Sequence, residues 1–267
     1  MPKPDVAYRS LTRSIGNALH RWDMIDDGDH ILVALSGGAD SITLLWALQD
    51  RLSRAPIQYR LTAAFVDPGF ENSFSRDLEA YCTESGYSFK WSLTDFGILA
   101  HSETNLENPC FLCSRLRRKR LFEMADELGC NKLALGHNKD DIIETFFMNI
   151  CYAGEVSTML PVQPMFGGSL TVIRPLAYTD QALIRRFARE RKLPVFVNPC
   201  PSAAASKRQD VKTLLESLYA GSSKIKGNIF RALHHVKLDY LLSPSNSLQA
   251  QKAPEGLHPK EPDWNGK

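Results

Sequence analysis

The 267-residue sequence predicts an α/β fold in which a Rossmann-like parallel sheet carries helices on both faces. Short apolar runs rich in β-branched residues alternate along the chain with longer stretches whose apolar residues recur at helical spacing. Glycine turns or acidic residues follow several of the runs, as is typical of strands that lead into helices in such folds. The hydrophobic content of 43% suffices for a large core, whereas the net charge of +2 favours no class of partner.

The predicted elements follow one another without an internal repeat. Apolar runs predict strands at 31–35, 59–66, 89–93, 132–135, 171–173 and 194–197. Helical spacing predicts helices at 5–23, 42–52, 72–84, 114–128, 140–151, 180–192, 207–219 and 225–239. Residues 94–109 and 154–169 are expected to be loops, the second because it holds three glycines and two prolines.

The chain is expected to have three parts: an N-terminal helix in 1–25, the main domain with a cysteine-containing insert in 26–242, and a disordered tail in 243–267. The tail is polar and proline-rich, with little to bury. No apolar run is long enough for a membrane span, and the first residues lack the apolar core of a signal peptide. We therefore expect a cytoplasmic protein without a membrane partner, whose six cysteines are reduced.

The turn after the first predicted strand has the composition of a phosphate-binding loop. Backbone N–H groups and the positive end of the following helix would point at one anion there, and Gly37 and Gly38 allow a close approach. Ser36 and Ser41 add hydroxyl groups. Asp40 would repel a phosphate unless a cation lay between them, so we expect Mg²⁺ at this turn. A tight turn closed by Ser and Asp caps is the simpler alternative.

Two further segments come directly after predicted strands. Asp67 ends the second strand, and Gly136 with His137 follows the strand at 132–135. Because the carboxyl ends of parallel strands meet at one edge of a sheet, these residues should border the same crevice as the glycine turn. Asp140 and Asp141 open the next helix, where N-capping is an alternative explanation for either one. A hydrogen bond within the turn is the simpler role for His137.

The cysteine spacing indicates a metal or redox site. Cys110 and Cys113 lie three residues apart near a predicted helix start, and Cys200, between two prolines, is the best third ligand. Buried free thiols, a redox dithiol and a zinc site remain alternatives, although zinc normally takes four ligands. Three thiolates without an obvious fourth partner suit a [4Fe-4S] cluster with one open iron.

A basic run follows the cysteine pair, with five of the six residues at 115–120 being Arg or Lys. Such a run is usually a solvated helix face, but beside a predicted site we expect contact with the phosphates of a polyanion. The side chains point in several helical directions, so only some of them can reach one partner. Basic residues near the two ends of the chain would extend this surface; they are Lys3, Arg9, Arg13, Lys224, Lys226, Arg231 and Lys237.

The glycine turn, Ser-Gly-Gly-Ala-Asp-Ser, resembles the PP-loop of the ATP-pyrophosphatase superfamily, which cleaves ATP between its α- and β-phosphates. Together with Cys-x-x-Cys-Ser-Arg-Leu-Arg-Arg, Leu-Gly-His-x-x-Asp-Asp-Ile, Arg-Pro-Leu at 174–176 and Cys200, it resembles the tRNA 2-thiocytidine synthetase family. The resemblance covers about residues 8–240. It implies ATP, Mg²⁺ and a [4Fe-4S] cluster as cofactors, with Cys110, Cys113 and Cys200 as cluster ligands and Asp40 as the magnesium ligand.

The resemblance implies that a tRNA base, cytidine at its C2 oxygen, is adenylated and then thiolated. The implied partners are tRNA, a sulfur donor such as a cysteine desulfurase, and a second copy of the chain in a homodimer. Two departures stand out: Ala39 replaces the usual lysine of the loop, and no second thiol follows Cys200. The alternatives are a lysidine-synthetase-like or amidotransferase-like enzyme, and a non-catalytic nucleotide-binding protein.

Overall fold

The computed structural model describes residues 5–202 and 207–241. The chain divides into two compact units, Met1–Gly221 and Ser222–Lys267. The first unit holds the sheet and nearly all of the helices, and the described part of the second holds α9 (Ile225–Ala232) and a 3₁₀ turn (Leu238–Tyr240). The expected tail at 243–267 lies outside the described residues, and the three-part division stays a prediction.

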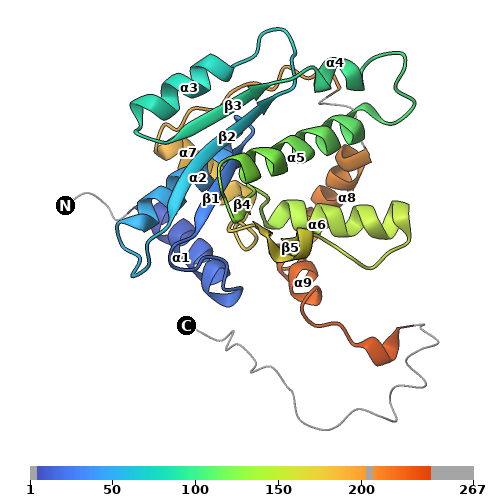
Figure 1. Ribbon diagram of the computed structural model, residues 1–267. Coiled ribbons are helices and arrows are strands. Elements are labelled where there is room, and N and C mark those ends of the chain that lie inside the picture. The colour runs from blue at the N-terminus through green and yellow to red at the C-terminus, as the bar shows by residue number, and fades with distance from the viewer. Residues whose placement is uncertain (1–4, 203–206, 242–267) are drawn as a thin grey trace. The chain divides into compact units, whose positions relative to one another are not determined.

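Within the described residues, the first unit is built on a six-stranded sheet (Figure 1). The order across the sheet is β3 (Phe89–Leu93), β2 (Arg60–Asp67), β1 (His30–Leu35), β4 (Lys132–Ala134), β6 (Leu170–Ile173) and β5 (Val162–Met165). All neighbours are parallel except β5, which pairs antiparallel with β6. The strand order reverses between β1 and β4, and ligands of α/β sheets bind at the carboxyl ends of such strands.

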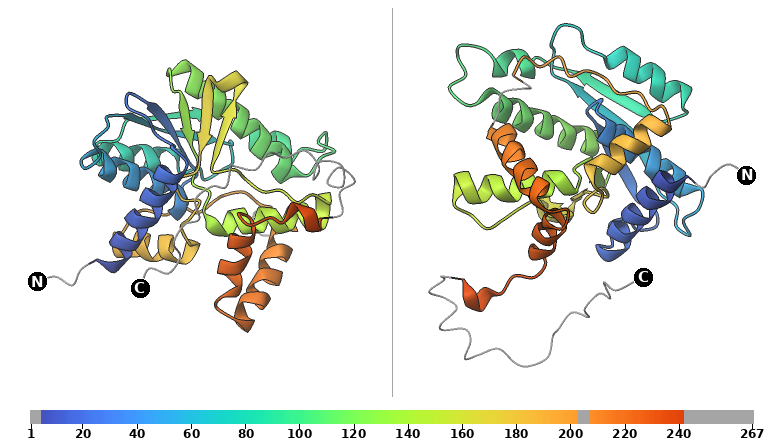
Figure 2. Two further views of the ribbon diagram at one scale, coloured as in Figure 1. Left: turned by 90° about the horizontal axis from the view of Figure 1, so that it is seen from below. Right: turned by 180° about the vertical axis from the view of Figure 1, so that it is seen from behind.

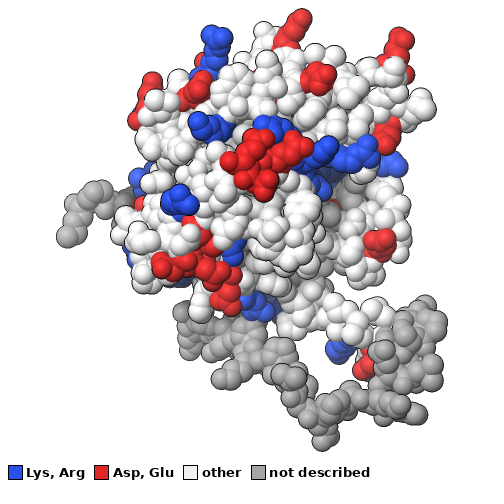
Figure 3. Space-filling model, viewed as in Figure 1, with Lys and Arg blue, Asp and Glu red and all other residues white. Residues whose placement is uncertain are grey.

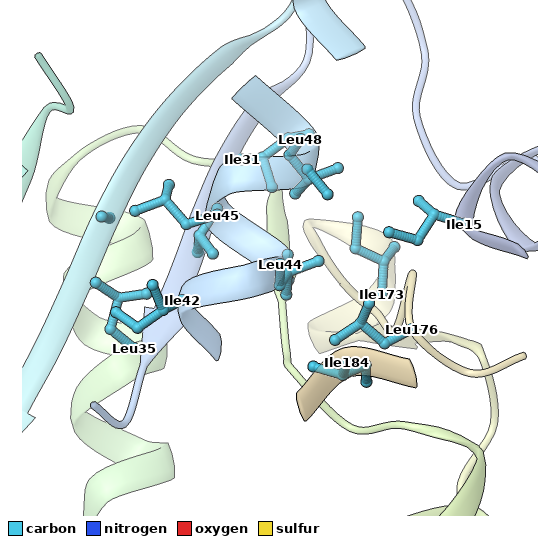
Figure 4. Close-up of a cluster of buried hydrophobic side chains, with 14 of the residues drawn as sticks. Ile15, Ile31, Leu35, Ile42, Leu44, Leu45, Leu48, Ile173, Leu176 and Ile184 are labelled. Atoms are coloured by element: carbon cyan, nitrogen blue, oxygen red, sulfur yellow. The ribbon is translucent and has the colours of Figure 1, made fainter. Parts of the chain in front are cut away.

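Helices cover both faces of the sheet, as the sequence predicts (Figure 2). Side chains along β1 alternate between two cores: Ile31, Val33 and Leu35 face one, and Leu32 and Ala34 face the other. The larger core is closed by α1 (Val6–Arg21), α2 (Ala39–Leu52), α3 (Ser75–Glu84) and α7 (Gln181–Glu190). Figure 4 shows its centre, where residues of α2 meet β1, β6 and α7. The smaller core lies under α5 (Pro109–Glu127).

The cysteine-bearing helix α5 begins earlier than the spacing of apolar residues predicts. Asn108 caps it, because its side chain accepts hydrogen bonds from the N–H groups of Cys110 and Phe111, and Pro109 occupies the first helical position. Both Cys110 and Cys113 are therefore in the first turns of the helix. The short helix α4 (Phe96–Ala100), which packs against α5, lies in a stretch expected to be a loop.

One predicted strand and one predicted loop are wrong. Residues 194–197 form no strand; instead the Phe196 N–H donates to the Gly37 carbonyl at 2.9 Å, and its ring stacks on Phe74 at 5.0 Å. Residues 194–197 therefore contact the glycine turn at the carboxyl end of β1 and do not pair with a strand of the sheet. Conversely, β5 lies in the expected loop at 154–169, and its Pro164 is tolerated because β5 is an edge strand.

The remaining helices differ from expectation at their ends. Helix α6 (Lys139–Met148) continues as a π-helical turn over Asn149–Ala153 and packs against α8 (Lys207–Gly221). Helix α9 is shorter than the predicted 225–239. Among the described helices, none combines the length and apolar character needed to cross a bilayer.

Candidate nucleotide and cysteine site

The turn between β1 and α2 is held open by its own serines. Ser41 Oγ accepts a hydrogen bond from the Ser36 N–H at 3.0 Å and donates to the Gly38 carbonyl at 3.1 Å. Gly38 is the N-cap of α2, and no side chain caps that helix end. The first N–H groups of α2 therefore remain available to an anion, as the sequence predicts.

Gly37 is the residue of the turn that no other amino acid can replace without strain. Its φ is +77°, and a Cβ there would lie 2.5 Å from the Phe74 ring. Gly136 makes the second close approach, since a Cβ there would come within 3.1 Å of the Ser41 backbone nitrogen. Gly136 thus lets the turn after β4 pack against the start of α2, and Gly37 leaves room for Phe74 and Phe196.

Asp40 carries the electrostatic signature of a cation site. Its Oδ1 is buried without a hydrogen-bond partner of normal geometry in the described part of the chain. Burial, with a smaller contribution from Asp141, raises the pKa of Asp40 to about 6, although the nearby Asn138 side chain opposes this. An Mg²⁺ ion would give the orphaned oxygen a partner and favour the charged carboxylate, so the residues fit a metal here.

Asp140 and Asp141 serve the fold through visible hydrogen bonds. Asn138 caps α6, and Asp141 Oδ2 accepts the Asn138 N–H at 2.9 Å, which completes a capping box. Asp140 Oδ2 accepts the N–H of Gln181 at 2.8 Å, so it joins α6 to the start of α7. Asn138 is thus the N-cap of α6, and Asp141 contributes to the capping box as the third helical residue, so neither aspartate is itself the N-cap.

His137 lies in a cationic environment. Its Nδ1 accepts a hydrogen bond from Arg174 Nε at 3.3 Å. Burial, followed by the charge of Arg174, lowers the pKa of His137 to about 3, which keeps the ring neutral. Arg174 also donates to the Leu160 carbonyl. The hydrogen bond of His137 therefore joins the turn after β4 to Arg174, which follows β6, and does not lie within the turn itself.

A pocket of about 250 Å³ opens beside the glycine turn. Asp67 forms part of its wall and is engaged by the hydroxyl groups of Ser73 and Ser75 and by the Gly69 N–H. The pocket therefore joins the ends of β1 and β2 to the segment that precedes Cys200. Its lining residues are Ser36, Gly38, Phe65, Asp67, Pro68, Ser73, Phe74, Arg117, Phe196, Asn198 and Pro199.

Arg117 is a site residue that its sequence context does not single out from the rest of the basic run. Its Nε is buried, lacks a hydrogen-bond partner among the described residues, and belongs to the wall of the pocket. Burial lowers the pKa of Arg117, whereas the neighbouring Cys113, Asp67 and Cys200 oppose that shift. Its spacing of four residues from Cys113, which puts both on one helix face, was the available signal.

The other basic residues of the run are largely neutralised on the surface. Arg115 pairs with Glu107 at 3.3 Å, and Arg120 pairs with Glu127 at 2.6 Å. Lys119 lies 3.9 Å from Glu123. Figure 3 shows basic and acidic side chains next to one another over α5. Ion pairs therefore engage Arg115, Lys119 and Arg120, and contact of this run with a polyanion stays a prediction.

The three predicted cysteine ligands converge, although they lie up to 90 residues apart. The sulfur atoms of Cys110 and Cys200 each lie 3.4 Å from the Ser202 hydroxyl. Burial raises the pKa of the Cys113 thiol; Arg117 opposes this, and Cys200 and Cys110 are near enough to add to it. Ser202 also contacts His101 Nε2 at 2.9 Å, and neither residue carries a local sequence signal for this role.

These thiols suit a cluster better than a single ion. In the described ranges, no three His, Cys, Asp or Glu side chains are close enough together to hold one metal ion. A cubane iron–sulfur cluster takes each thiolate at a different corner and needs no such compact group. Three thiols without a fourth match a cluster that keeps one iron free of protein ligands.

The parallel sheet, the open glycine turn after β1 and the acidic turn after β4 define a nucleotide-binding protein of the PP-loop class. The family model described as "PP-loop domain" matches residues 8–216. The tRNA-cytidine(32) 2-sulfurtransferase of Geobacter sulfurreducens is 37% identical over 241 residues, which is 89% of this chain and 94% of the relative. That of Syntrophotalea carbinolica is 37% identical over 244 residues, 90% of this chain and 94% of the relative.

The chain belongs to the PP-loop family and, within it, to the tRNA-cytidine(32) 2-sulfurtransferases. Among solved structures, it is similar to the U34-tRNA thiolase NcsA from Methanococcus maripaludis with its [4Fe-4S] cluster. The TM-score is 0.72 at 26% identity, over 86% of this chain and 80% of that one. The fold class and the family resemblance predicted from the motifs are confirmed.

Proposed function

We propose that this chain is an ATP-dependent tRNA sulfurtransferase that replaces the C2 oxygen of a cytidine, at position 32 as its relatives' name states, with sulfur. The observation that carries the proposal is the shared wall of the nucleotide pocket and the cysteine site. Arg117 lies in the pocket and beside Cys113, and Pro199 of the pocket directly precedes Cys200. Base activation and sulfur delivery would thus take place side by side.

The pocket residues would position ATP for adenylation of the base. The N–H groups at the start of α2 and the hydroxyl groups of the turn would hold phosphate oxygens, and Asp40 would hold Mg²⁺. The cytidine C2 oxygen attacks the α-phosphorus, and pyrophosphate leaves. Such a reaction depends on alignment and on compensation of charge, which favours a cation beside the phosphates. Arg117 supplies that cation in a chain that has Ala39 where its family usually has lysine.

Cys110, Cys113 and Cys200 would hold a [4Fe-4S] cluster, in keeping with the cluster named for the structural relative. Such a cluster, when bound, supplies a sulfur atom at the iron that no protein side chain occupies. The new C2–S bond forms as AMP leaves with the original oxygen. Ser202 and His101 lie where they can orient the thiol groups of Cys110 and Cys200.

The substrate of this reaction is tRNA, and a sulfur donor such as a cysteine desulfurase would replenish the transferred atom. A homodimer and a cytoplasmic location remain expectations from the sequence. Amine transfer of the lysidine-synthetase kind needs no thiols, so it leaves the gathering of three cysteines at the pocket without a purpose.

Replacement of one cluster ligand tests the proposal. Cys200→Ser should abolish tRNA thiolation and lower the iron and sulfide content after anaerobic purification, while ATP binding stays unchanged. Cys151→Ser is the matched control, because Cys151 is an exposed thiol on the π-helical turn and should affect neither property. Thiolation by the Cys200→Ser variant, or a wild-type protein without iron under strict exclusion of oxygen, would overturn the cluster assignment.

A further inference from the structure

A second hollow, of about 300 Å³, lies between α1 and α2 and takes no part in the site described above. Four arginines line it, Arg9 and Arg13 from α1 and Arg51 and Arg54 from the end of α2 and the residues after it. Thr12, Ile15 and Ala47 complete the wall. The guanidinium group of Arg51 reaches α1, since a Cβ on Gly16 would lie 3.8 Å from its Nη1.

The positive charge of this hollow is compensated at only one of its four arginines. Arg54 forms an ion pair with Asp50 and lies over the Tyr8 ring. Over the described parts of the chain, Arg9, Arg13 and Arg51 have no carboxylate within ion-pair distance. Three positive side chains therefore surround one hollow, which is the charge pattern of an anion site.

The arrangement is unfavourable for the folded protein by itself. Arg9 and Arg13 are four residues apart on α1, so their charges repel each other on one helix face. Arg9 also lies in the first turn of α1, where the positive end of the helix dipole disfavours a cation. Only Arg51, in the last turn of α2, has a position where the helix dipole favours a positive charge. A bound anion would offset the repulsion.

We propose that this hollow binds backbone phosphates of the tRNA substrate at a distance from the modified base, an inference that rests on the proposed function. Guanidinium forks bind phosphate oxygens in pairs, and three of the four arginines are exposed, as contact with a polymer requires. Helix α2 begins at the glycine turn and reaches Arg51 after about 18 Å at 1.5 Å per residue. That is less than one turn of a nucleic-acid double helix, about 34 Å, so one RNA can reach both sites.

The test compares two double variants of equal charge by their binding to tRNA over a range of salt concentrations. The variant Arg9→Gln with Arg13→Gln removes the pair on α1. The matched control, Arg186→Gln with Arg189→Gln, removes two exposed arginines of α7 that do not line the hollow. Each lost phosphate contact should reduce the slope of log Kd against log salt by about 1. The α1 variant should therefore lose about 2 in slope, and the control should lose none.

The thermal stability of the free protein separates binding from folding. Because like charges on α1 are removed, the melting temperature of the α1 variant should stay equal to that of the wild type or rise. Equal slopes for the α1 variant and the control would overturn this inference and leave the proposed function standing. If the wild type itself shows no salt-dependent binding of tRNA, the proposed function fails, and the inference fails with it.

Discussion

Arg117→Met is the change that most directly tests how the pocket recognises ATP. Methionine keeps most of the side-chain length and removes the positive charge. In the wild type, the buried Nε has no protein partner in the described residues, so its hydrogen bond is available to a phosphate. A hydrogen bond to a charged group contributes about 1.5–3 kcal/mol, which corresponds to an ATP dissociation constant about 10- to 150-fold higher in the variant.

The same structure predicts that the folded protein tolerates this change. Burial disfavours the charge of Arg117, as the lowered pKa of this side chain indicates. Removal of a desolvated charge that forms no ion pair among the described residues relieves a cost, so the free energy of unfolding should stay constant or rise. Arg117→Lys keeps the charge without the fork and should bind ATP with intermediate affinity.

Calorimetric titration with Mg²⁺ and a non-hydrolysable ATP analogue measures the effect. Lys119→Met is the matched control. The Lys119 side chain is 75% exposed, and its ion pair with Glu123, at 3.9 Å, is long and weak. The control should bind the analogue as the wild type does. Wild-type affinity in Arg117→Met would show that Arg117 does not bind the ATP phosphates, and an equal loss of affinity in Lys119→Met would show that the effect is not specific to Arg117.

Two further predictions concern the turns that build the site. Gly37→Ala should lower the free energy of unfolding by about 1–3 kcal/mol and weaken ATP binding, because its φ of +77° is strained for alanine and the new Cβ would meet the Phe74 ring at 2.5 Å. Gly86→Ala is the control for backbone strain alone, since φ is +71° there but nothing lies within 4 Å of the added Cβ. Urea unfolding and ATP titration are measured for both variants. An equal loss of ATP binding in the two would contradict the steric argument. His137→Gln should remove a pH dependence of stability. The pKa of His137 is about 3 in the folded state and near 6.5 in the unfolded state. Below pH 6.5 the unfolded chain therefore binds a proton at this residue that the folded chain does not bind, and stability decreases as the pH falls. Between pH 6 and 4, the free energy of unfolding of the wild type should therefore fall relative to that of His137→Gln by up to about 1.4 kcal/mol per pH unit, as measured by urea unfolding. A stability difference that does not change with pH would show that the ring is protonated in the folded state.

Local sequence signals were sufficient wherever an element is stabilised by its own residues. The run at 31–35 is apolar and β-branched, and it became β1; the glycine turn and the helix after it followed as predicted. The strand at 89–93 matches the structure residue for residue. These elements depend on side chains that are neighbours in the sequence, so a single pass along the chain can detect them.

Segments whose structure depends on pairing with another segment were assigned wrongly. The run at 194–197 has the composition of a strand, but Phe196 pairs with Gly37 and Phe74 and not with a neighbouring strand. The edge strand β5 contains a proline and forms because β6 offers it a partner. In both cases the partner lies at a point in the chain that local composition does not reveal.

Most of the alternating strands and helices, the phosphate-binding turn and the cysteine spacing could be predicted from the sequence, because each depends on backbone propensity and on residues a few positions apart. Tertiary structure alone decided which of five basic side chains on α5 enters the pocket, and it brought Ser202 and His101 to the thiols. It also gathered four arginines of α1 and α2 around one hollow. Burial and charge compensation are properties of the packed chain, since they depend on side chains that only folding brings into contact.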